Sequence, residues 1–296
     1  MWLDFLRKKK ILAVENFDTA KICSIRVGGI AALYLEPQDI EGLMLSVNAC
    51  RENSVKYKVI GNCTNTAFDG RGFSGAVIST RSIKGYFLKG SVVEIECGAL
   101  YSTVASALSE QGVILPPELC GIPASIGGMV RNNAGAYGAC VADIIAHADL
   151  YFPEEGEIRR AYPDELELSY RSSSIIRSGA VLISAGLLAE KGNAEHFKAA
   201  VAALRDKRRA SQPASPSLGS FYKRDGEIIP ARLIDSLGLK GFSVGGAQIS
   251  KKHAGFIINS GGASFYDILR LADFIEKRVF EEFSVRLTRE AELVLD

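Results

Sequence analysis

The stretch GIPASIGGMVRNNAGAYG, residues 121–138, and the shorter YKVIGNCTN, residues 57–65, decide the fold that this sequence predicts. Five glycines, two asparagines and one proline in the longer stretch would weaken a helix or strand for no structural gain. Close approach of the backbone to a large ligand explains this composition. The shorter stretch follows a β-rich run with a glycine-started polar loop, which can aim N–H groups at phosphate oxygens, although a plain tight turn explains that loop alone. Neither stretch matches GxGxxG, the motif of a Rossmann dinucleotide site, or GxxxxGK[ST], the motif of a Walker loop. We therefore expect a nucleotide held in a fold other than these two.

Outward from these stretches, β-rich runs alternate with glycine turns up to about residue 190 and predict an α+β domain. The expected strands lie in AALYLEP (31–37), YKVIGN (57–62), GAVIST (75–80), SVVEIECGA (91–99) and AVLISAGLL (180–188). YSTVASALSEQG (101–112) predicts a helix that ends at Gly112. Residues 1–18 predict an N-terminal amphipathic surface helix, because they are too short and too charged for a signal sequence or a membrane span.

After about residue 190 the pattern becomes helical, which predicts a second domain over residues 191–296. EHFKAAVAALRDKRR (195–209) and SFYDILRLADFIEKRVFEEF (264–283) predict helices, the second with Ser264 and Asp267 in capping-box spacing. The alternation in SVRLTREAELVL (284–295) predicts a strand that carries Glu290 on its polar face.

The composition is that of an ordinary soluble protein, with 35 basic and 34 acidic side chains. This balance offers no electrostatic argument for nucleic acid or a membrane surface as a partner. The six cysteines form no CxxC pair and no metal-like cluster with the three histidines, so we expect reduced thiols in the cytoplasm and no metal.

Six segments in order resemble the UDP-N-acetylenolpyruvoylglucosamine reductase family. They are SIRVGGIAALYLEP (24–37), GNCTN (61–65), GIPASIGGMVRNNAGAYG (121–138), LSYRSS (168–173), QPASPSLGSFYK (212–223) and GLKGFSVGGAQISKKHAGFIINSGGAS (238–264). The resemblance implies an FAD-binding PCMH-type (vanillyl-alcohol-oxidase-like) domain over residues 1–190 and a smaller α/β substrate-binding domain over 191–296, in the shorter, type II form. We expect a cytoplasmic monomer, and we expect FAD to be held noncovalently because no histidine that could tether it lies near the glycine-rich loops. The implied reaction is the reduction by NADPH of the enolpyruvyl group of a UDP-sugar to UDP-N-acetylmuramate for peptidoglycan synthesis.

The resemblance also implies the binding residues. Those for FAD are Gly61, Asn62, Cys63, Thr64, Asn65, Gly121, Ile122, Pro123, Ser125, Ile126, Gly127, Gly128, Asn133, Gly135, Ala136 and Tyr137. Those for the substrate are Tyr170, Arg208, Lys223, Gln248 and His253, of which His253 could equally be a structural histidine.

Four segments depart from the family pattern. Asn62, Cys63 and Thr64 replace two glycines and a serine of Gly-Gly-Gly-Ser-Asn, so their side chains must turn away from the phosphates or FAD binds less tightly. Lys-Gln-Pro reads Ser211-Gln212-Pro213, no proline follows Lys223, and the closing Glu-Pro-Glu reads Thr288-Arg289-Glu290.

Three residues are the implied catalytic groups. From the local sequence alone Ser220 would be a turn residue, Arg171 a surface arginine and Glu290 a solvated glutamate. The resemblance makes Ser220 the proton donor to C2 of the enolpyruvyl ether, with Lys223 and Arg224 following it. It gives Arg171 a planar fork for a carboxylate and Glu290 a part in stabilising the enolate.

Two other functions stay open from the sequence. One is an FAD-dependent oxidase of an alcohol or hydroxy acid, but such proteins often tether flavin through His or Cys, and no histidine lies near either glycine cluster. The other is a flavin-binding scaffold without turnover. The presence of Ser220, Arg171 and Glu290 together argues against this scaffold.

Overall fold

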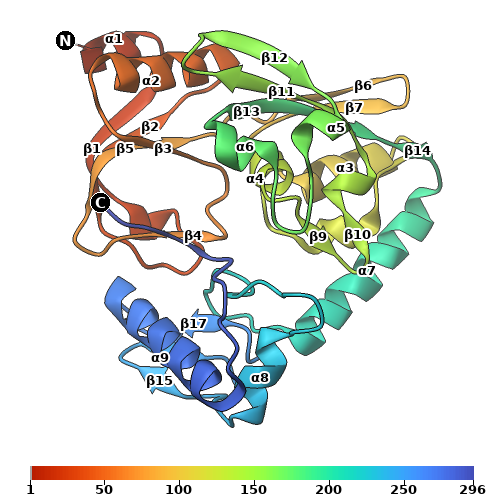
Figure 1. Cartoon of the computed structure of the whole chain (residues 1–296). Helices are drawn as coiled ribbons and strands as arrows, with labels where there is room; N and C mark the ends of the chain where they lie inside the picture. The colour runs from red at the N-terminus through yellow and green to blue at the C-terminus, as the bar shows by residue number, and fades with distance from the viewer. Residues whose placement is uncertain (1) are drawn as a thin grey trace. The chain divides into compact units, whose positions relative to one another are not determined.

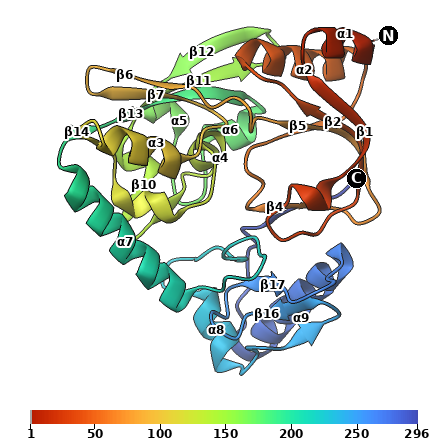
Figure 2. The ribbon, with the colours of Figure 1, turned by 180° about the vertical axis from the view of Figure 1, so that it is seen from behind.

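The computed structural model describes residues 2–296, which form two compact units (Figures 1 and 2). Of the described residues, the first comprises 2–15, 33–62 and 75–207, and the second 16–32, 63–74 and 208–296. No limit of a unit falls at residues 190 and 191. Helix α7 (Ala194–Ser211), expected to open the second domain, lies in the first unit up to residue 207 because Phe197 packs into that unit's core. The functional division at residue 190 stays a prediction.

The first unit contains an antiparallel five-stranded sheet in the order β12-β11-β13-β7-β6. Its strands are β6 (Tyr86–Lys89), β7 (Val92–Glu96), β11 (Ile145–Phe152), β12 (Glu157–Ala161) and β13 (Val181–Leu188). Helices α3 (Tyr101–Ser109) and α4 (Ile126–Arg131) lie on one face of this sheet (Figures 1 and 2). The apolar alternation of Ile183, Ala185 and Leu187 directs these side chains into the core.

A four-stranded sheet, in the order β1-β2-β5-β3, lies mostly in this unit. It consists of β1 (Leu12–Asp18), β2 (Ile30–Glu36), β5 (Phe73–Ser79) and β3 (Tyr57–Ile60). Helices α1 (Trp2–Lys8) and α2 (Ile40–Glu52) pack against each other beside it, and Asp39 caps α2 by accepting a hydrogen bond from the N–H of Gly42. The strands predicted at residues 31–37, 57–62 and 75–80 are confirmed here, as are those at 91–99 and 180–188 in the larger sheet.

The prediction of a helix over residues 1–18 is wrong after Lys8. The chain leaves the helix at Lys10, which has a left-handed φ of 62°, and Ile11 is buried. Residues 12–18 then pair with β2 in the sheet. Sheet pairing therefore overrides the helical pattern of the first residues.

The second unit packs helix α9 (Phe265–Phe283) against a three-stranded sheet of β15 (Ser243–Val244), β16 (Ala247–Ile249) and β17 (Ile257–Asn259). The predicted capping box is confirmed, since Ser264 and Asp267 bond each other's backbone N–H groups. The unit also contains α8 (Pro230–Ser236) and a parallel pair of β4 (Thr66–Phe68) and β18 (Glu292–Val294). The strand predicted over 284–295 is thus correct only for β18.

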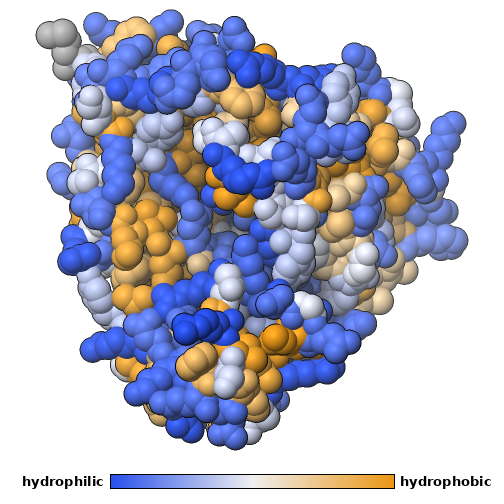
Figure 3. Space-filling model, in the orientation of Figure 1, coloured by the Kyte–Doolittle hydropathy of each residue, from blue (hydrophilic) through white to orange (hydrophobic). Residues whose placement is uncertain are grey.

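The remaining elements are short. They are η1 (Thr19–Lys21), β8 (Val113–Ile114), η2 (Pro117–Gly121), β9 (Gly135–Ala136), β10 (Ala139–Cys140), η3 (Val141–Asp143), α5 (Pro163–Leu166), α6 (Ser174–Ser178) and β14 (Glu190–Lys191). Of the helices described, none has the length and apolarity needed to span a membrane. On the face drawn in Figure 3, hydrophilic residues separate the hydrophobic areas from one another.

Candidate active site

The two glycine-rich stretches meet at a cavity of about 350 Å³ in the first unit. Gly61 follows β3, and Ser125, Gly127 and Gly128 come from the start of α4, so four predicted FAD residues line this cavity together. The other lining residues did not follow from the sequence. They are Tyr57, Lys58, Val59, Ile60, Thr80, Cys97, Arg131, Ile175, Ile176 and residues 179–182.

The hydroxyl of Ser125 identifies the cavity as a polar-ligand site. Ser125 is 1% exposed, and its Oγ has no hydrogen-bond partner among the described residues. A buried hydroxyl without a partner costs about 1–3 kcal/mol, which a bound acceptor would recover. A side chain at Gly61 would fill the same space, because its Cβ would lie 1.9 Å from Ser125 Oγ. Both observations fit FAD with its backbone-bound pyrophosphate.

We expect Gly61→Val to abolish FAD binding while the protein still folds. The branched side chain would occupy the position of Ser125 Oγ and the approach of a phosphate to the backbone. Flavin absorbance per protein after purification measures the effect, with Gly70→Val as the control, since Gly70 has no left-handed φ and a Cβ there would lie 3.4 Å or more from any other atom. Parental flavin content in Gly61→Val would move the cofactor site elsewhere.

Further along the glycine-rich stretch, several predicted FAD residues serve the local backbone. Asn133 is buried, donates to the carbonyl of Ser169 and accepts from the N–H of Ala142. Gly135 lies in the β9-β10 hairpin, where a Cβ would be 2.8 Å from the carbonyl oxygen of Ala139. The members of this set that do not line the cavity are Gly121, Ile122, Pro123, Ile126, Asn133, Gly135, Ala136 and Tyr137. Their FAD contacts stay predictions.

The departures at Asn62 and Cys63 have a structural explanation. The Asn62 amide donates to the carbonyl of Pro123 at 2.7 Å, and Cys63 is buried with its Sγ 3.3 Å from that of Cys23. Both side chains thus turn into the protein. Cys63 has a left-handed φ of 51°, which explains why glycine is the family residue at this position. The cysteines, which look scattered in the sequence, include this close pair of free thiols.

Arg171 lies in a tight turn of the first unit. Ser169 and Ser172 exchange both backbone hydrogen bonds, and Arg171 between them has a left-handed φ of 52°. Its guanidinium lies over the ring of Tyr170, 5.1 Å from the centroid, and donates to the carbonyls of Asn133 and Gly135 at 3.4 Å. The turn therefore holds both predicted residues beside the glycine-rich stretch.

Strained backbone is concentrated at the predicted site. Of the ten non-glycine residues described with positive φ, four belong to the predicted site: Cys63, Asn133, Tyr137 and Arg171. Such conformations cost about 1–3 kcal/mol each and cluster at functional sites.

Ser220 lies in the second unit on an anchored segment. Gly219, with a φ of 77°, turns the chain, and the buried Phe221 follows with its N–H donated to the carbonyl of Gly255 at 2.9 Å. The Tyr222 hydroxyl donates to the carbonyl of Ala272 in α9 at 3.1 Å. Ser220 itself is exposed, and its hydroxyl has no hydrogen-bond partner in residues 2–296. A fixed backbone thus presents an available hydroxyl.

Glu290 lies on the neighbouring segment of the same unit. Its N–H donates to the carbonyl of Phe221 at 2.8 Å, while Lys223 N–H donates to the carbonyl of Thr288 at 2.8 Å. Arg289, which replaces the family's proline, binds Glu276 on α9 through two contacts of 2.5 and 3.0 Å. The structure therefore brings Ser220 and Glu290 onto adjacent backbone segments. Arg289, where the chain departs from Glu-Pro-Glu, is held by its ion pair with Glu276.

Among the predicted substrate residues, Gln248 and His253 already have protein partners. Gln248 donates its amide to the carbonyl of Gly241 and to Ser243 Oγ. His253 Nδ1 accepts the N–H of Gly255, and burial lowers the pKa of this imidazole. A neutral His253 thus keeps Nε2 for a ligand. Lys223 is half-buried, and Arg208 lies in the last turn of α7.

A second cavity, of about 450 Å³, lies in the second unit and is lined by none of the predicted site residues. Arg26, Arg71 and Asp18 are on its wall. Two oxygens of the buried Asp69 bind Arg71, which lowers the pKa of that carboxyl to about 2. The arginine is therefore committed to a structural pair.

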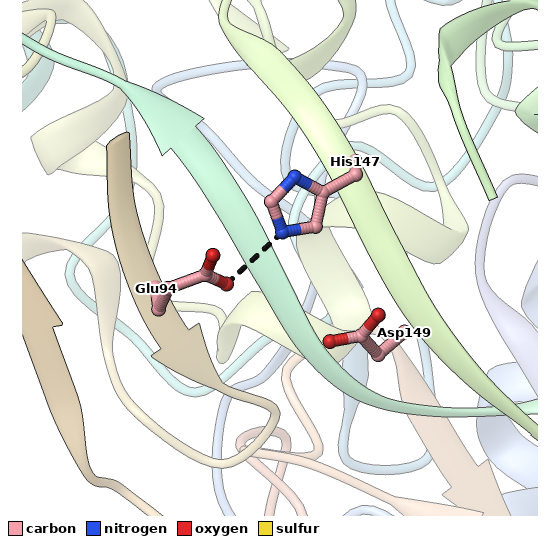
Figure 4. Close-up of side chains that lie close together, drawn as sticks. All are labelled: Glu94, His147 and Asp149. Carbon is pink, nitrogen blue, oxygen red and sulfur yellow. Dashed lines mark hydrogen bonds and ion pairs between the residues drawn. The ribbon is translucent and has the colours of Figure 1, made fainter. Parts of the chain in front are cut away.

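Three potential metal ligands, Glu94, His147 and Asp149, lie together on the five-stranded sheet (Figure 4). His147 Nε2 is 3.0 Å from Glu94 Oε2 across Gly186, whose missing side chain makes room for the imidazole. Both oxygens of Asp149 accept from Arg160 at 2.8 Å. Because that guanidinium would repel a cation at Asp149, we assign the cluster a structural role.

Comparisons with known proteins agree with this site. Residues 31–162 match the sequence profile of an FAD binding domain, and residues 212–294 that of the C-terminal domain of UDP-N-acetylenolpyruvoylglucosamine reductase. The reductase of Clostridium novyi (strain NT) is 36% identical over 293 residues, covering 99% of this chain and 94% of the relative. That of Clostridium perfringens (strain SM101 / Type A) is 38% identical over 270 residues, covering 91% and 88%. The crystal structure of the enzyme from Thermus caldophilus superposes with a TM-score of 0.80 at 29% identity, covering 96% of this chain and 98% of that one. The chain belongs to the UDP-N-acetylenolpyruvoylglucosamine reductase family.

Proposed function

We infer that this protein catalyses the FAD-dependent reduction, by NADPH, of the enolpyruvyl group of UDP-N-acetyl-3-O-(1-carboxyvinyl)glucosamine to UDP-N-acetylmuramate. The observation that carries the proposal is the hydrogen bond from Glu290 N–H to the carbonyl of Phe221, because it joins the segment that carries Glu290 to the residue that follows the proposed proton donor, Ser220. The product is a precursor of peptidoglycan.

The chemistry defines what the protein must supply. Bound FAD would take a hydride from NADPH and pass it to C3 of the enolpyruvyl ether. Negative charge then develops on C2 and its carboxylate, so this charge needs stabilisation and C2 needs a proton. The protein's own groups have to meet both needs.

Ser220 is our proposed proton donor at C2. Its solution pKa is high, but a carbanion-like carbon is a strong base, and cations can stabilise the alkoxide that remains. Lys223 lies three residues on, half-buried and fixed by its N–H bond to Thr288. An exposed hydroxyl on an anchored backbone keeps its position while the proton moves.

Arg171 and Glu290 are our proposed partners for the developing charge. Arg171 offers a planar fork for the substrate carboxylate, and its left-handed turn and the Tyr170 ring fix its direction. Glu290 belongs to the second unit with Ser220 and would help to stabilise the enolate.

The cofactor is noncovalent in this proposal. Among the described residues that line the FAD cavity there is no histidine and one thiol, Cys97. Burial raises the pKa of Cys97 to about 12, so it is not a nucleophile at neutral pH. We expect acid precipitation to leave all flavin in the supernatant, read as absorbance. Yellow colour retained in the washed pellet would show a covalent link.

Location and assembly complete the proposal. We propose that the protein works as a monomer in the cytoplasm, where NADPH and the UDP-sugar are available. Its near-neutral charge balance agrees with small-molecule partners instead of nucleic acid or a membrane surface.

Steady-state NADPH oxidation under nitrogen tests the function. The rate should depend on the enolpyruvyl sugar and vanish without it. Oxygen consumption that is driven by a simple alcohol without NADPH, and that does not depend on the sugar, would instead identify an oxidase.

A further inference from the structure

We propose that Asn65 is a positioning residue for the reaction, acting by holding the backbone of Glu290. The resemblance assigns Asn65 to the cofactor loop, so this role is a different one. The inference rests on the proposed function. All the residues that carry it lie in the second unit, so their contacts are internal to one compact body.

The contacts join Asn65 to both sides of Glu290. The Asn65 side-chain nitrogen donates to the carbonyl of Glu290 at 2.9 Å, and the Asn65 carbonyl accepts the N–H of Glu292 at 2.8 Å. Because Glu290 contributes an oxygen at this contact, Asn65 must present its NH₂ group and not its amide oxygen. Immediately afterwards, β4 and β18 pair in parallel, with Thr66 opposite Glu292.

Glu290 needs such a partner because it lies outside regular structure. Strand β18 begins only at Glu292, and the chain from residue 284 to 288 has no strand or helix. The N–H of Glu290 is bonded to Phe221, beside Ser220, which leaves the carbonyl to Asn65. The two hydrogen bonds fix the peptide groups on either side of the Glu290 Cα, and with them the Cα–Cβ direction from which the carboxylate extends.

The same geometry limits what Asn65 can do for a cofactor. Its side-chain nitrogen donates to the carbonyl of Glu290, and its backbone carbonyl accepts the N–H of Glu292. A substitution that keeps the shape but removes the donor separates the two roles. Asn65→Asp does so, since a carboxylate cannot donate to a carbonyl and repels it.

The test compares Asn65→Asp with Asn53→Asp in full-length, FAD-loaded protein. Asn53 is a matched control in the first unit, where its side-chain nitrogen donates to the carbonyl of Ala49 at the end of α2. We measure flavin content, flavin bleaching by NADPH, and reoxidation by the enolpyruvyl sugar without oxygen. Hydrogen–deuterium exchange of the peptide covering residues 286–292 gives a readout independent of turnover.

For Asn65→Asp we expect parental flavin content, bleaching within about twofold of the parent, and reoxidation slowed about 10- to 100-fold, the cost of a small misplacement of a reacting group. Exchange in residues 286–292 should rise, whereas Asn53→Asp should match the parent in all four measurements. Asn65→Ser, which adds no charge, should show the same pattern and serves if Asn65→Asp does not fold.

A double variant decides whether Asn65 acts through Glu290. Asn65→Asp combined with Glu290→Gln should reoxidise no more slowly than Glu290→Gln alone, because the positioned carboxylate is already gone. Three results would each overturn the inference. They are reoxidation of the double variant that is slower than that of Glu290→Gln alone, loss of flavin from Asn65→Asp, and reoxidation of Asn65→Asp at the same rate as Asn53→Asp. A parent that the sugar does not reoxidise would instead overturn the proposed function.

Discussion

Ser220→Ala should bind FAD and be bleached by NADPH at nearly the parental rate, yet be reoxidised by the enolpyruvyl sugar about 10²–10⁴-fold more slowly. The first half-reaction needs no proton at C2, and the second does. The fold should tolerate the change, because Ser220 is exposed and the buried Phe221 and Tyr222 anchor its segment.

Stopped-flow absorbance follows the two half-reactions separately under nitrogen. Ser220→Cys should recover part of the second step, since a thiol can still donate a proton. Slow bleaching together with intact reoxidation in Ser220→Ala would place the serine on the nicotinamide side and contradict its assignment.

Arg171→Lys should keep the positive charge and lose most of the turnover. A point ammonium cannot make the paired contacts of a guanidinium with a carboxylate, nor stack on Tyr170 in the same way. Arg177→Lys is the matched control, because Arg177 is exposed on α6 and pairs with Glu167. We expect kcat of the control to equal that of the parent.

The measurement for Arg171→Lys is kcat at saturating sugar and NADPH. A value within about threefold of the parent corresponds to less than ~1 kcal/mol of transition-state stabilisation. Such a result would make a catalytic role for Arg171 untenable.

Much of the fold could be predicted because periodicity reports burial. The runs ending near residues 36, 60, 79, 96 and 188 are strands, and α9 begins at its predicted cap. The errors lie where partners distant in the sequence decide the conformation. Residues 12–18 join a sheet, and residues 288–291 bond to the segment that follows Ser220 instead of forming a strand.

The site was predictable in composition but not in its contacts. The glycine-rich loops identified Gly61 and Ser125 as neighbours of a ligand, whereas the cavity residues Tyr57 and Cys97 carry no local signal. Nothing in the sequence shows that the Asn65 side chain reaches a residue 225 positions away. Likewise, the sequence does not show that Arg289 pairs with Glu276.

The identity of the product tests the central claim most directly. Purified protein is mixed under nitrogen with NADPH and the enolpyruvyl UDP-sugar, and the sugar is then weighed by mass spectrometry. We expect a product heavier by two hydrogen atoms, formed in equal amount to the NADPH consumed and absent from a Ser220→Ala reaction of the same duration. An unchanged sugar, with NADPH consumed only when oxygen is admitted, would contradict the account.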